Sequence, residues 1–329
     1  MEKNSRTWRW GILGCGDVTE VKSGPAYQNT KGFEVVAVMR RDAVKAADYA
    51  KRHGIPKYYA NADALIKDPE VDAVYIATPP DSHRTYALEV ARAGKPCCIE
   101  KPMAPNYQES LEIFTAFEER GIPLFVAYYR RSLPRFLQIE KWLKEEAIGT
   151  VRHLRWHLAK PASEEDRSGE YNWRTDDHIA PGGYFDDLAS HGLDLFSFLF
   201  GPITQAQGIA LNQQRLYSAK DAVTASWLHD QGVVGEGSWI FGGFTHEDTV
   251  EITGDKGRIT FSIFHDNPLL LENGLEKQAL NIDHPEHIQQ YHVENIKKHL
   301  DGLGTHPSTG STGLHTSWVM DRILGVAEI

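Results

Sequence analysis

The chain has 329 residues, of which 41% are hydrophobic and 24% are charged, which is typical of a soluble globular protein and excludes a disordered or fibrous one. This length favours two domains over a single core. The formal net charge of -10 argues against a nucleic-acid partner, because phosphate binding requires clustered Lys and Arg, and the longest apolar run near the middle of the sequence is too short to span a membrane.

The cysteines and the first residues indicate the compartment. Cys15, Cys97 and Cys98 fall in segments expected to be interior strand or tight turn, and two of them are adjacent, so they cannot form a disulfide framework. Residues 1–6 contain no apolar segment ahead of the first strand, so no signal peptide is expected. A reduced, cytoplasmic location is predicted.

The first half of the chain alternates strands with helices. The pattern predicts strands at 8–13, 33–39, 73–77, 96–99 and 124–127, and helices at 43–53, 81–93 and 106–121. Asn106 followed by Glu109 resembles a capping box at the start of the third helix. Alternation with short connections predicts a doubly wound parallel α/β sheet of the Rossmann type over residues 1–128.

The second half has a different pattern. It predicts helices at 136–146, 183–200, 288–300 and 314–329, and strands at 151–158, 205–211, 222–228, 233–240, 249–253 and 258–264. The last two strands flank a Gly-Asp-Lys-Gly turn and are predicted to form a hairpin. A polar stretch at 160–179 is expected to be a long loop. Residues 129–329 are therefore predicted to form an α+β domain with a mainly antiparallel open sheet.

A glycine-rich turn follows the first predicted strand. Its sequence is Gly14-Cys15-Gly16-Asp17-Val18-Thr19. This fits the dinucleotide-binding pattern G-x-G-x-x-G except that Thr19 occupies the third glycine position. The first glycine would form the tight turn and the second would let the backbone approach a pyrophosphate. The alternative is a structural turn in an unrelated α/β protein.

The end of the second strand bears on cofactor choice. An acid there would bind the ribose 2′-hydroxyl of NAD, whereas arginine suits the 2′-phosphate of NADP. Arg40 stands where the acid is expected and Arg41 follows it, while Asp42 is placed to cap the next helix. NADP is the predicted cofactor, and the alternative is NAD with both arginines in solvent.

Lys101 lies at the carboxyl end of the fourth strong strand, between Glu100 and Pro102. This edge of a doubly wound sheet faces the ligand, so Lys101 would point toward whatever the glycine turn holds. Near a nicotinamide, partial burial and a neighbouring cation would lower the lysine pKa into the range of an acid/base catalyst. The alternative is an ordinary surface lysine after a strand.

Asp187 and His191 are four residues apart on one face of the predicted helix at 183–200. His191 could relay a proton or bind a hydroxyl, Asp187 could orient the imidazole or bind substrate, and Asp194 could steady the histidine. A solvent-facing polar stripe is the alternative, but the surrounding residues are apolar. Neither H-E-x-x-H nor C-x-x-C is present, so no metal site is predicted.

Several motifs in register resemble the Gfo/Idh/MocA oxidoreductases across nearly the whole chain. They are the glycine turn, Ala77-Thr78-Pro79-Pro80 with His83, Glu100-Lys101-Pro102, the segment from Gly182 to His191, and Gly254-Asp255-Lys256-Gly257. The resemblance implies a Rossmann domain, a larger mixed sheet of the kind that often forms the interface of a dimer or tetramer, and NAD(P)-dependent chemistry on a sugar, cyclitol or related polyol.

The resemblance also implies roles for individual residues. Lys101 would be the catalytic lysine, His191 its partner, and Asp187 a substrate-binding or assisting group. The nicotinamide end would be lined by Thr78, Pro79, His83 and Glu100. Thr19 and Arg40 depart from the family pattern, and Arg40 bears directly on the choice between NAD and NADP.

Aromatic and arginine side chains are predicted to shape the substrate pocket. Tyr129 and Arg130 follow the last Rossmann strand, Trp173 and Arg174 lie in the long loop, and Tyr184 follows the glycine pair. Aromatic faces stack on sugar rings and arginine donates to hydroxyls or carboxylates. The alternative is packing by the aromatic rings with the arginines in solvent.

The leading hypothesis is an NAD(P)-dependent sugar or polyol dehydrogenase or reductase. One rival is a glycosidase that oxidises its substrate transiently and restores the hydride after elimination. A second is a cofactor-binding regulator without turnover, against which the presence of both Lys101 and His191 speaks, because a binding module needs no acid/base pair.

Overall fold

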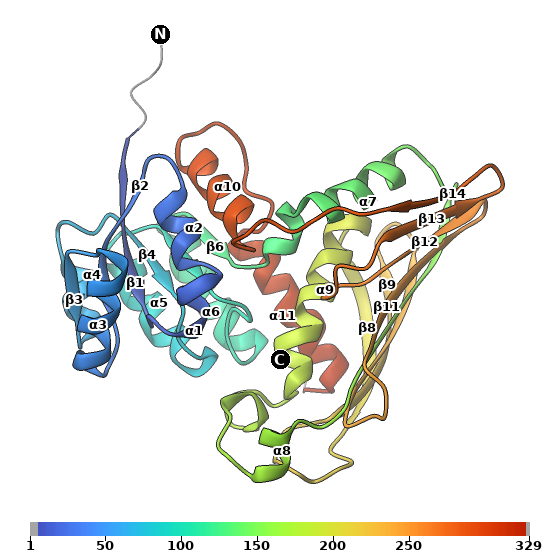
Figure 1. Cartoon of the computed structure of the whole chain (residues 1–329), viewed down its shortest axis with the longest axis horizontal. Coiled ribbons are helices and arrows are strands. Elements are labelled where there is room, and N and C mark those ends of the chain that lie inside the picture. Colours follow the sequence, from blue (N-terminus) through green and yellow to red (C-terminus); the bar gives the residue numbers. More distant parts are fainter. Residues whose placement is uncertain (1–5, 327–329) are drawn as a thin grey trace. The chain divides into compact units, whose positions relative to one another are not determined.

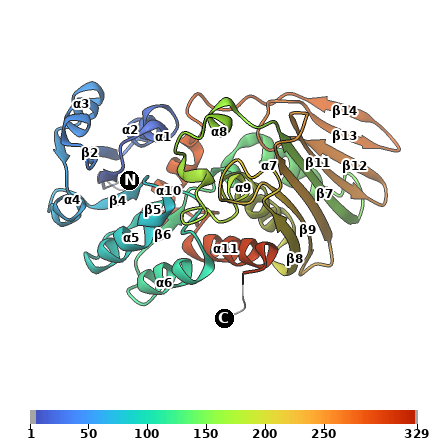
Figure 2. The same ribbon diagram turned by 90° about the horizontal axis from the view of Figure 1, so that it is seen from below.

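The chain forms two compact units, and each unit combines two segments of the sequence. The structure is a computed structural model that describes residues 6–326. The first unit contains residues 6–132 and 285–314, and the second contains residues 133–284 and 315–326. Figures 1 and 2 show the elements of both units from two directions.

A parallel sheet forms the centre of the first unit. Its six strands lie in the order β3-β2-β1-β4-β5-β6, and the neighbouring strands pair in parallel. They are β1 (Trp8–Leu13), β2 (Phe33–Met39), β3 (Lys57–Tyr59), β4 (Ala73–Ile76), β5 (Cys97–Ile99) and β6 (Leu124–Val126). The order reverses between β1 and β4, which is where ligands bind in such sheets. The predicted doubly wound Rossmann sheet is confirmed.

Helices cover both faces of this sheet. They are α1 (Asp17–Val21), α2 (Gly24–Asn29), α3 (Ala43–His53), α4 (Ala62–Lys67), α5 (His83–Arg92), α6 (Tyr107–Glu118) and α10 (Gln290–Leu300), with short 3-10 turns η1 (Pro80–Ser82) and η2 (Tyr129–Ser132). One apolar core joins α4, α5 and α6 to the strands, and a second joins α2, α3 and α10 to the opposite face. Strand side chains alternate between the two cores, as the pleat requires.

Local capping explains where α3 begins and ends. The Asp42 carboxylate accepts hydrogen bonds from the backbone N–H groups of Val44 and Lys45, and Gly54 ends the helix with φ at 67°. A side-chain acceptor at the first position and a left-handed glycine after the last are the usual helix termini. The predicted helix at 43–53 and the capping role of Asp42 are confirmed.

Several short elements of the first unit were not predicted. Strand β3 has three residues, too few for a periodic pattern, and α4 has six. The segment after the glycine turn is also split into two short helices, α1 and α2, because Pro25 starts a new helix.

The second unit is built on an eight-stranded sheet in the order β14-β13-β12-β11-β7-β10-β9-β8. Strands β7 and β10 are parallel and the other pairs are antiparallel, so the predicted mainly antiparallel α+β sheet is confirmed. The strands are β7 (Val151–Lys160), β8 (Ile203–Leu211), β9 (Ala222–His229), β10 (Val234–Phe241), β11 (Glu247–Gly254), β12 (Gly257–Phe261), β13 (Leu269–Asn273) and β14 (Lys277–Leu280).

Aromatic side chains hold helix α9 (Tyr184–Phe200) against one face of this sheet. The rings of Trp156 and Phe196 meet edge to face with centroids 5.7 Å apart, and Trp239 meets Trp156 at 5.4 Å. Gly192 faces the Trp156 ring so closely that a Cβ there would lie 2.3 Å from it. Close helix–sheet contact at this point fixes the position of the residues that α9 carries.

The remaining helices of the second unit correct three expectations. The loop predicted at 160–179 contains α8 (Glu164–Ser168) and the turn η3 (Trp173–Thr175), and α7 spans Pro134–Lys144. The last helix, α11, spans Gly310–Leu324 and therefore starts earlier than residue 314 and enters both units. Of its predicted range, residues 327–329 lie outside the described residues.

Within residues 6–326, no helix is both long and apolar enough to cross a bilayer. The three cysteines are buried and unpaired. Of the residues on which the expectation of no signal peptide rests, 1–5 lie outside the described part of the chain.

Candidate active site

The glycine turn connects β1 to α1. Gly14 adopts φ of 91°, and its N–H and that of Cys15 donate to the Met39 carbonyl at 2.9 and 3.2 Å. A Cβ on Gly14 would lie 2.7 Å from the Thr78 side chain, so glycine is required both for the backbone conformation and for the close approach of the loop after β4. Gly16 has open space around its Cα, with no atom nearer than 4.0 Å to a built Cβ. This arrangement fits a bound dinucleotide.

Thr19 replaces the third glycine without opening the turn. Its buried hydroxyl donates to the Gly16 carbonyl at 2.7 Å, and its own carbonyl accepts from the Tyr49 hydroxyl at 2.9 Å. The close packing usually given by the third glycine is supplied by Gly24, where a Cβ would lie 2.2 Å from the Thr19 carbonyl. The departure from the glycine pattern is therefore compensated five residues later.

Arg40 lies beside the glycine turn. Its guanidinium donates to the Cys15 carbonyl at 3.1 Å. Arg41 is exposed, and Asp42 is engaged as the cap of α3. Asp42 is thus held at the helix start, and Arg40 is the charged side chain at the end of β2 that contacts the turn.

The loop after β4 is joined to the Lys101 segment by His83. The ring of this fully buried histidine lies between the Thr78 carbonyl, 2.8 Å from Nε2, and the Pro102 carbonyl, 3.1 Å from Nδ1. Burial lowers the pKa of His83 below its usual value. His83 therefore acts on this region through the backbone. Pro79 precedes η1 and is half-buried.

Glu100 is a buried carboxylate next to Lys101. Its Oε1 accepts hydrogen bonds from the Tyr75 hydroxyl at 2.6 Å and from the Gln289 amide at 2.7 Å. Its Oε2 accepts from the backbone N–H of Lys101 at 3.2 Å. Lys101 itself is half-buried. Tyr75 and Gln289 were not recognised in the sequence, although a tyrosine in an interior strand usually needs a partner for its hydroxyl.

Tyr129 and Arg130 begin the turn η2, directly after the last Rossmann strand. The Arg130 guanidinium lies over the Tyr129 ring at 5.0 Å, and Arg130 is buried. The neighbouring Arg131 donates to the Pro307 carbonyl at 3.0 Å. Such packing is as consistent with a structural role for Tyr129 and Arg130 as it is with contact to a substrate.

In the second unit, α9 begins with a strained turn and a buried acid. Gly183 has φ of 65°, and a Cβ there would lie 2.5 Å from the Lys220 carbonyl. The Asp186 carboxylate accepts from the Gly182 N–H at 2.8 Å. Burial raises the pKa of Asp186 to about 7. Asp186 was part of the recognised motif but had no predicted role.

Asp187 binds the long loop. Its carboxylate accepts from Arg174 Nε at 3.0 Å, and the Arg174 guanidinium lies over the Trp173 ring at 4.3 Å. Tyr184, three residues earlier on α9, donates to Asp166 at 2.7 Å. The predicted residues of this unit are therefore brought together by the loop.

His191 lies two turns into α9 and is 4% exposed. Its ring meets the Phe264 ring edge to face at 6.0 Å. Asp194 is fully buried and accepts from the Thr316 hydroxyl at 3.2 Å. His191 is therefore buried, and the alternative of a solvent-facing polar stripe does not apply to it.

The candidate residues fall into two groups, one in each unit. The first unit brings together the glycine turn, Arg40, Thr78, His83, Glu100 and Lys101 around the carboxyl ends of the parallel strands. The second brings together Trp173, Arg174, Tyr184 and Asp187 at the start of α9, with His191 further along the helix.

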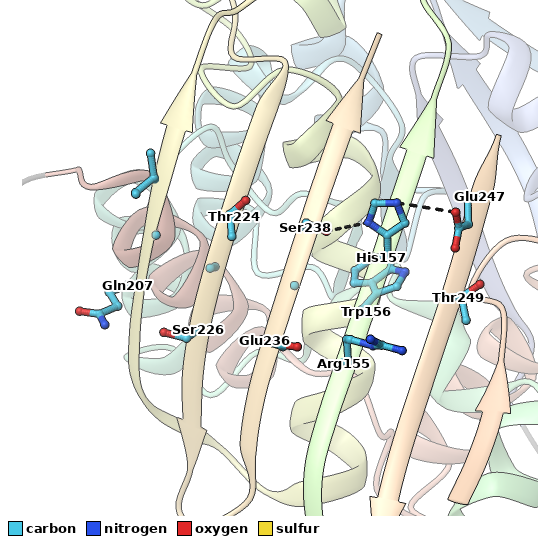
Figure 3. Close-up of a pocket in the computed structure, with 14 residues that line it drawn as sticks. Arg155, Trp156, His157, Gln207, Thr224, Ser226, Glu236, Ser238, Glu247 and Thr249 are labelled. Carbon is cyan, nitrogen blue, oxygen red and sulfur yellow. Dashed lines mark hydrogen bonds and ion pairs between the residues drawn. The ribbon is translucent and has the colours of Figure 1, made fainter. Parts of the chain in front are cut away.

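A cavity of about 840 Å³ lies elsewhere, on the outer face of the second sheet (Figure 3). His157, which lines it from β7, contacts Ser238 at 2.7 Å and lies 3.8 Å from Glu247, on the strands at either side. Residues that line it include Ile209 and Thr224. The residues predicted from the sequence do not line this cavity.

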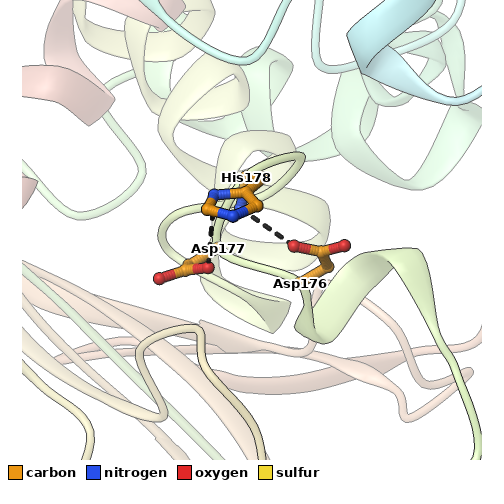
Figure 4. A group of neighbouring side chains, drawn as sticks. All are labelled: Asp176, Asp177 and His178. Carbon is orange, nitrogen blue, oxygen red and sulfur yellow. Dashed lines mark hydrogen bonds and ion pairs between the residues drawn. The ribbon is translucent and has the colours of Figure 1, made fainter.

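Three side chains of the long loop could offer ligand atoms to a cation. Asp176, Asp177 and His178 place one such atom each within 4.8 Å of the others (Figure 4). The Asp176 carboxylate accepts from the His178 N–H at 3.0 Å, and Asp177 donates its N–H to Ser218 at 2.9 Å. These contacts shape the turn that follows Arg174.

Two family models match the chain. One, described as an oxidoreductase family with an NAD-binding Rossmann fold, matches residues 8–128. The other, described as a GFO/IDH/MocA C-terminal domain, matches residues 136–260. Together they cover most of both units.

Individual proteins resemble the chain over most of its length. An oxidoreductase from Formosa agariphila is 36% identical over 317 residues, covering 96% of this chain and 98% of the relative. Trans-1,2-dihydrobenzene-1,2-diol dehydrogenase from Bos taurus is 29% identical over 76% of this chain and 72% of that protein. The structure of levoglucosan dehydrogenase in complex with NADH and levoglucosan is similar with a TM-score of 0.85 at 22% identity, covering 96% of each chain. At that identity the likeness shows the fold.

Proposed function

The chain belongs to the Gfo/Idh/MocA family of NAD-binding oxidoreductases, and on this premise we propose that it transfers a hydride between a nicotinamide cofactor and a carbinol or carbonyl carbon of a sugar, cyclitol or related polyol. The observation that carries the proposal is the position of Lys101. It follows β5 at the carboxyl edge of the parallel sheet, where the glycine turn after β1 also lies.

Two relatives support the substrate class. One is named for a diol on a six-membered carbon ring, and a structural neighbour is named for an anhydrosugar. Both names describe rings that carry hydroxyl groups. A ring carbinol with neighbouring hydroxyls is therefore the proposed substrate.

The cofactor would be held by the backbone of the glycine turn (Gly14 to Val18), with Arg40 and Arg41 toward the ribose and with Thr78 and Pro79 toward the nicotinamide. His83 would support the nicotinamide end through its contacts with the backbone of this loop and of the Lys101 segment. When bound, the nicotinamide supplies a carbon that accepts or donates hydride. Lys101 takes the hydroxyl proton during oxidation and returns it during reduction, because an alkoxide must not accumulate at neutral pH.

The second unit supplies the substrate side of the proposal. His191 relays the proton from Lys101, and Asp187 binds a substrate hydroxyl while Arg174 holds its carboxylate in one orientation. Trp173 and Tyr184 offer aromatic faces, and Tyr129 with Arg130 is the counterpart in the first unit. Ring stacking and charged hydrogen bonds are the usual means of recognising sugars.

An absorbance assay at the wavelength of reduced nicotinamide tests this function. Purified protein with NAD or NADP and a panel of sugars, cyclitols and dihydrodiols should oxidise at least one class, and keto-sugars should be reduced with the reduced cofactor. Absence of any change across the panel would contradict the proposal. Release of a chromogenic aglycone without net cofactor change would identify the glycosidase instead.

NADP is the proposed cofactor because Arg40 occupies the position of the ribose-binding acid. Arg40→Asp should move the ratio of kcat/KM for NADP over NAD toward NAD by about tenfold or more, since a bidentate partner of the 2′-phosphate is lost. Arg92→Asp, at an exposed arginine of the same unit outside the proposed cofactor site, is the matched control. A higher kcat/KM with NAD in the unmutated protein would refute the preference.

Assembly through the second sheet is also proposed. Its outer face exposes Ile209, Leu211 and Ile240 beside polar side chains such as those of His157 and Glu247, and exposed apolar side chains on a sheet face are suited to contact with another copy. Ile209→Glu should shift the mass in solution from dimer or tetramer to monomer. A wild-type protein that sediments as a monomer would contradict this. The three buried cysteines form no disulfide, which supports a cytoplasmic location.

A further inference from the structure

The first unit is completed by a segment from near the end of the sequence. Residues 285–314 follow the second sheet in the chain but belong to the parallel-sheet unit. Gln289 stands at the start of α10 in this segment and is 1% exposed. A glutamine amide buried to this degree requires hydrogen-bond partners, so its contacts have consequences.

The returning segment contacts both the end of α1 and the lysine strand. His287 Nδ1 lies 2.9 Å from the Val21 carbonyl, and the Gln289 N–H donates to the Lys22 carbonyl at 3.4 Å. The Gln289 side chain then reaches Glu100 Oε1 at 2.7 Å. Gln289 thus connects the helix after the glycine turn to the residue before Lys101.

Tyr75 binds the same carboxylate oxygen. It is fully buried on β4, its ring stacks on Tyr27 with centroids 4.9 Å apart, and its hydroxyl donates to Glu100 Oε1 at 2.6 Å. Burial raises the pKa of Tyr75 well above its usual value, so the hydroxyl stays protonated and remains a donor.

A buried carboxylate without donors is strongly destabilised, and charged hydrogen bonds are the strong ones. With Oε1 held by Tyr75 and Gln289, Oε2 is directed at the backbone N–H of Lys101. The contact fixes the peptide from which the Lys101 side chain extends. Loss of either donor would let the Glu100 carboxyl rotate, and this fixation would be lost.

We propose that Gln289 and Tyr75 are positioning residues that hold the Glu100 carboxylate and, through the Lys101 N–H, set the direction of the lysine. The proposal rests on the proposed function, in which Lys101 transfers the proton. It adds a residue from outside the matched Rossmann segment, residues 8–128, to the proton-transfer machinery.

Four variants test the proposal. Gln289→Leu removes the amide at similar volume, Tyr75→Phe removes the hydroxyl, and Gln289→Glu places a second carboxyl against Glu100. Gln290→Leu is the matched control, because this neighbouring glutamine is half-buried and donates to Glu294 at 3.0 Å on its own helix. The measurements are kcat across pH 5–10, substrate KM, the nucleotide Kd and the melting temperature.

Gln289→Leu and Tyr75→Phe should each lower kcat about 10- to 100-fold and move the pH dependence of kcat, with nucleotide Kd within about threefold of wild type. Gln289→Glu should be most active at low pH, where one of the two carboxyls is protonated and can donate to the other, and should lose activity as pH rises. Gln290→Leu should behave as wild type.

The positioning role would be overturned if Gln289→Glu and Tyr75→Phe kept the kcat and pH profile of wild type while Lys101→Ala lost activity. The proposed function would then still stand. Full activity of Lys101→Ala would overturn both. If Gln289→Leu fails to fold, the pH profile of Gln289→Glu and the kcat of Tyr75→Phe still test the positioning role.

Discussion

Two buried carboxyls stand one residue before a proposed functional side chain, and their surroundings differ. Glu100 precedes Lys101 and accepts hydrogen bonds from Tyr75, Gln289 and a backbone N–H. Asp186 precedes Asp187 and accepts from the Gly182 N–H, and burial raises its pKa to about 7.

The difference lies in the donors that each buried acid receives. The first region gives its carboxyl two side-chain donors and a backbone donor, which fix its orientation beside the proposed proton-transfer group. The second gives Asp186 a backbone donor at the start of a helix, and burial raises the pKa of this acid. The first region would then serve chemistry, and the second would serve substrate positioning.

Lys101→Ala is the strongest test of the chemical region. Removing a positioned acid/base should lower kcat by about two to four orders of magnitude. Nucleotide affinity should stay nearly intact, because the phosphates are expected on the glycine turn. Steady-state kinetics and a nucleotide titration measure the two quantities. Lost nucleotide binding would mean that Lys101 is a cofactor ligand first, and retained turnover would direct attention to Tyr184 and Asp187.

His191→Ala tests whether α9 also takes part in the proton transfer. We expect a loss of about ten- to a thousandfold in kcat, less than for Lys101 because water can substitute in a relay. The double variant should lose less than the product of the single losses, since groups that act as a unit are not additive. His178→Ala, an exposed histidine of the same unit, is the control. Multiplicative losses would place the two residues in separate roles.

Asp186→Asn tests the neutral acid in the second region. Because the folded-state pKa is raised from 3.8 to about 7, the stability that Asp186 contributes is present below about pH 4 and is lost as pH rises through about 7. Asparagine cannot ionise and can still accept from Gly182. As pH rises from 4 to 8, the unfolding free energy of the variant should therefore increase relative to that of wild type by roughly 2–4 kcal/mol.

Urea unfolding at several pH values measures this difference, with Asp177→Asn on the exposed loop as the control. If the difference in unfolding free energy between variant and wild type stayed constant from pH 5 to 8, Asp186 would be ionised throughout this range. The comparison with Glu100 would then rest on the number of hydrogen-bond donors alone.

Arg174→Ala should have the smallest effect. Arg174 is 40% exposed where it pairs with Asp187, and exposed ion pairs contribute about 1 kcal/mol or less. Substrate KM should rise about five- to tenfold with little change in kcat, because Asp187 loses its fixed orientation. Arg167→Ala, an exposed arginine of the same loop, is the control. A large fall in kcat would move Asp187 into the chemical region.

Long, strongly patterned elements were predictable from the sequence. The strands at 8–13 and 33–39 and the helix at 43–53 agree residue for residue with β1, β2 and α3, because apolar runs, Asp42 and Gly54 all indicate the same boundaries. Short or half-exposed elements lacked such signals. Strands β3 and β14 lie at sheet edges, where burial imposes little alternation on the sequence.

Candidate site residues that belong to sequence motifs were predictable. Residues that reach the site only through tertiary contacts were not. Lys101, Glu100 and His191 stand in recognisable segments. Gln289 does not, because its partner is 189 positions away and only the fold brings the two together. Asp42 as a helix cap was predictable because the cap is local.

The discontinuity of the first unit has a consequence for synthesis. Ser308 donates to the Val126 carbonyl at 2.8 Å, Thr309 forms a bridge with Phe125, and α10 fills one core of the parallel sheet. These residues leave the ribosome after the entire second sheet has been translated. The first unit therefore cannot complete its fold until they have been synthesised. A fragment that ends at residue 132 would expose apolar strand surface and leave Glu100 without the amide of Gln289. The two halves are therefore inseparable as expression units, although each has its own sheet.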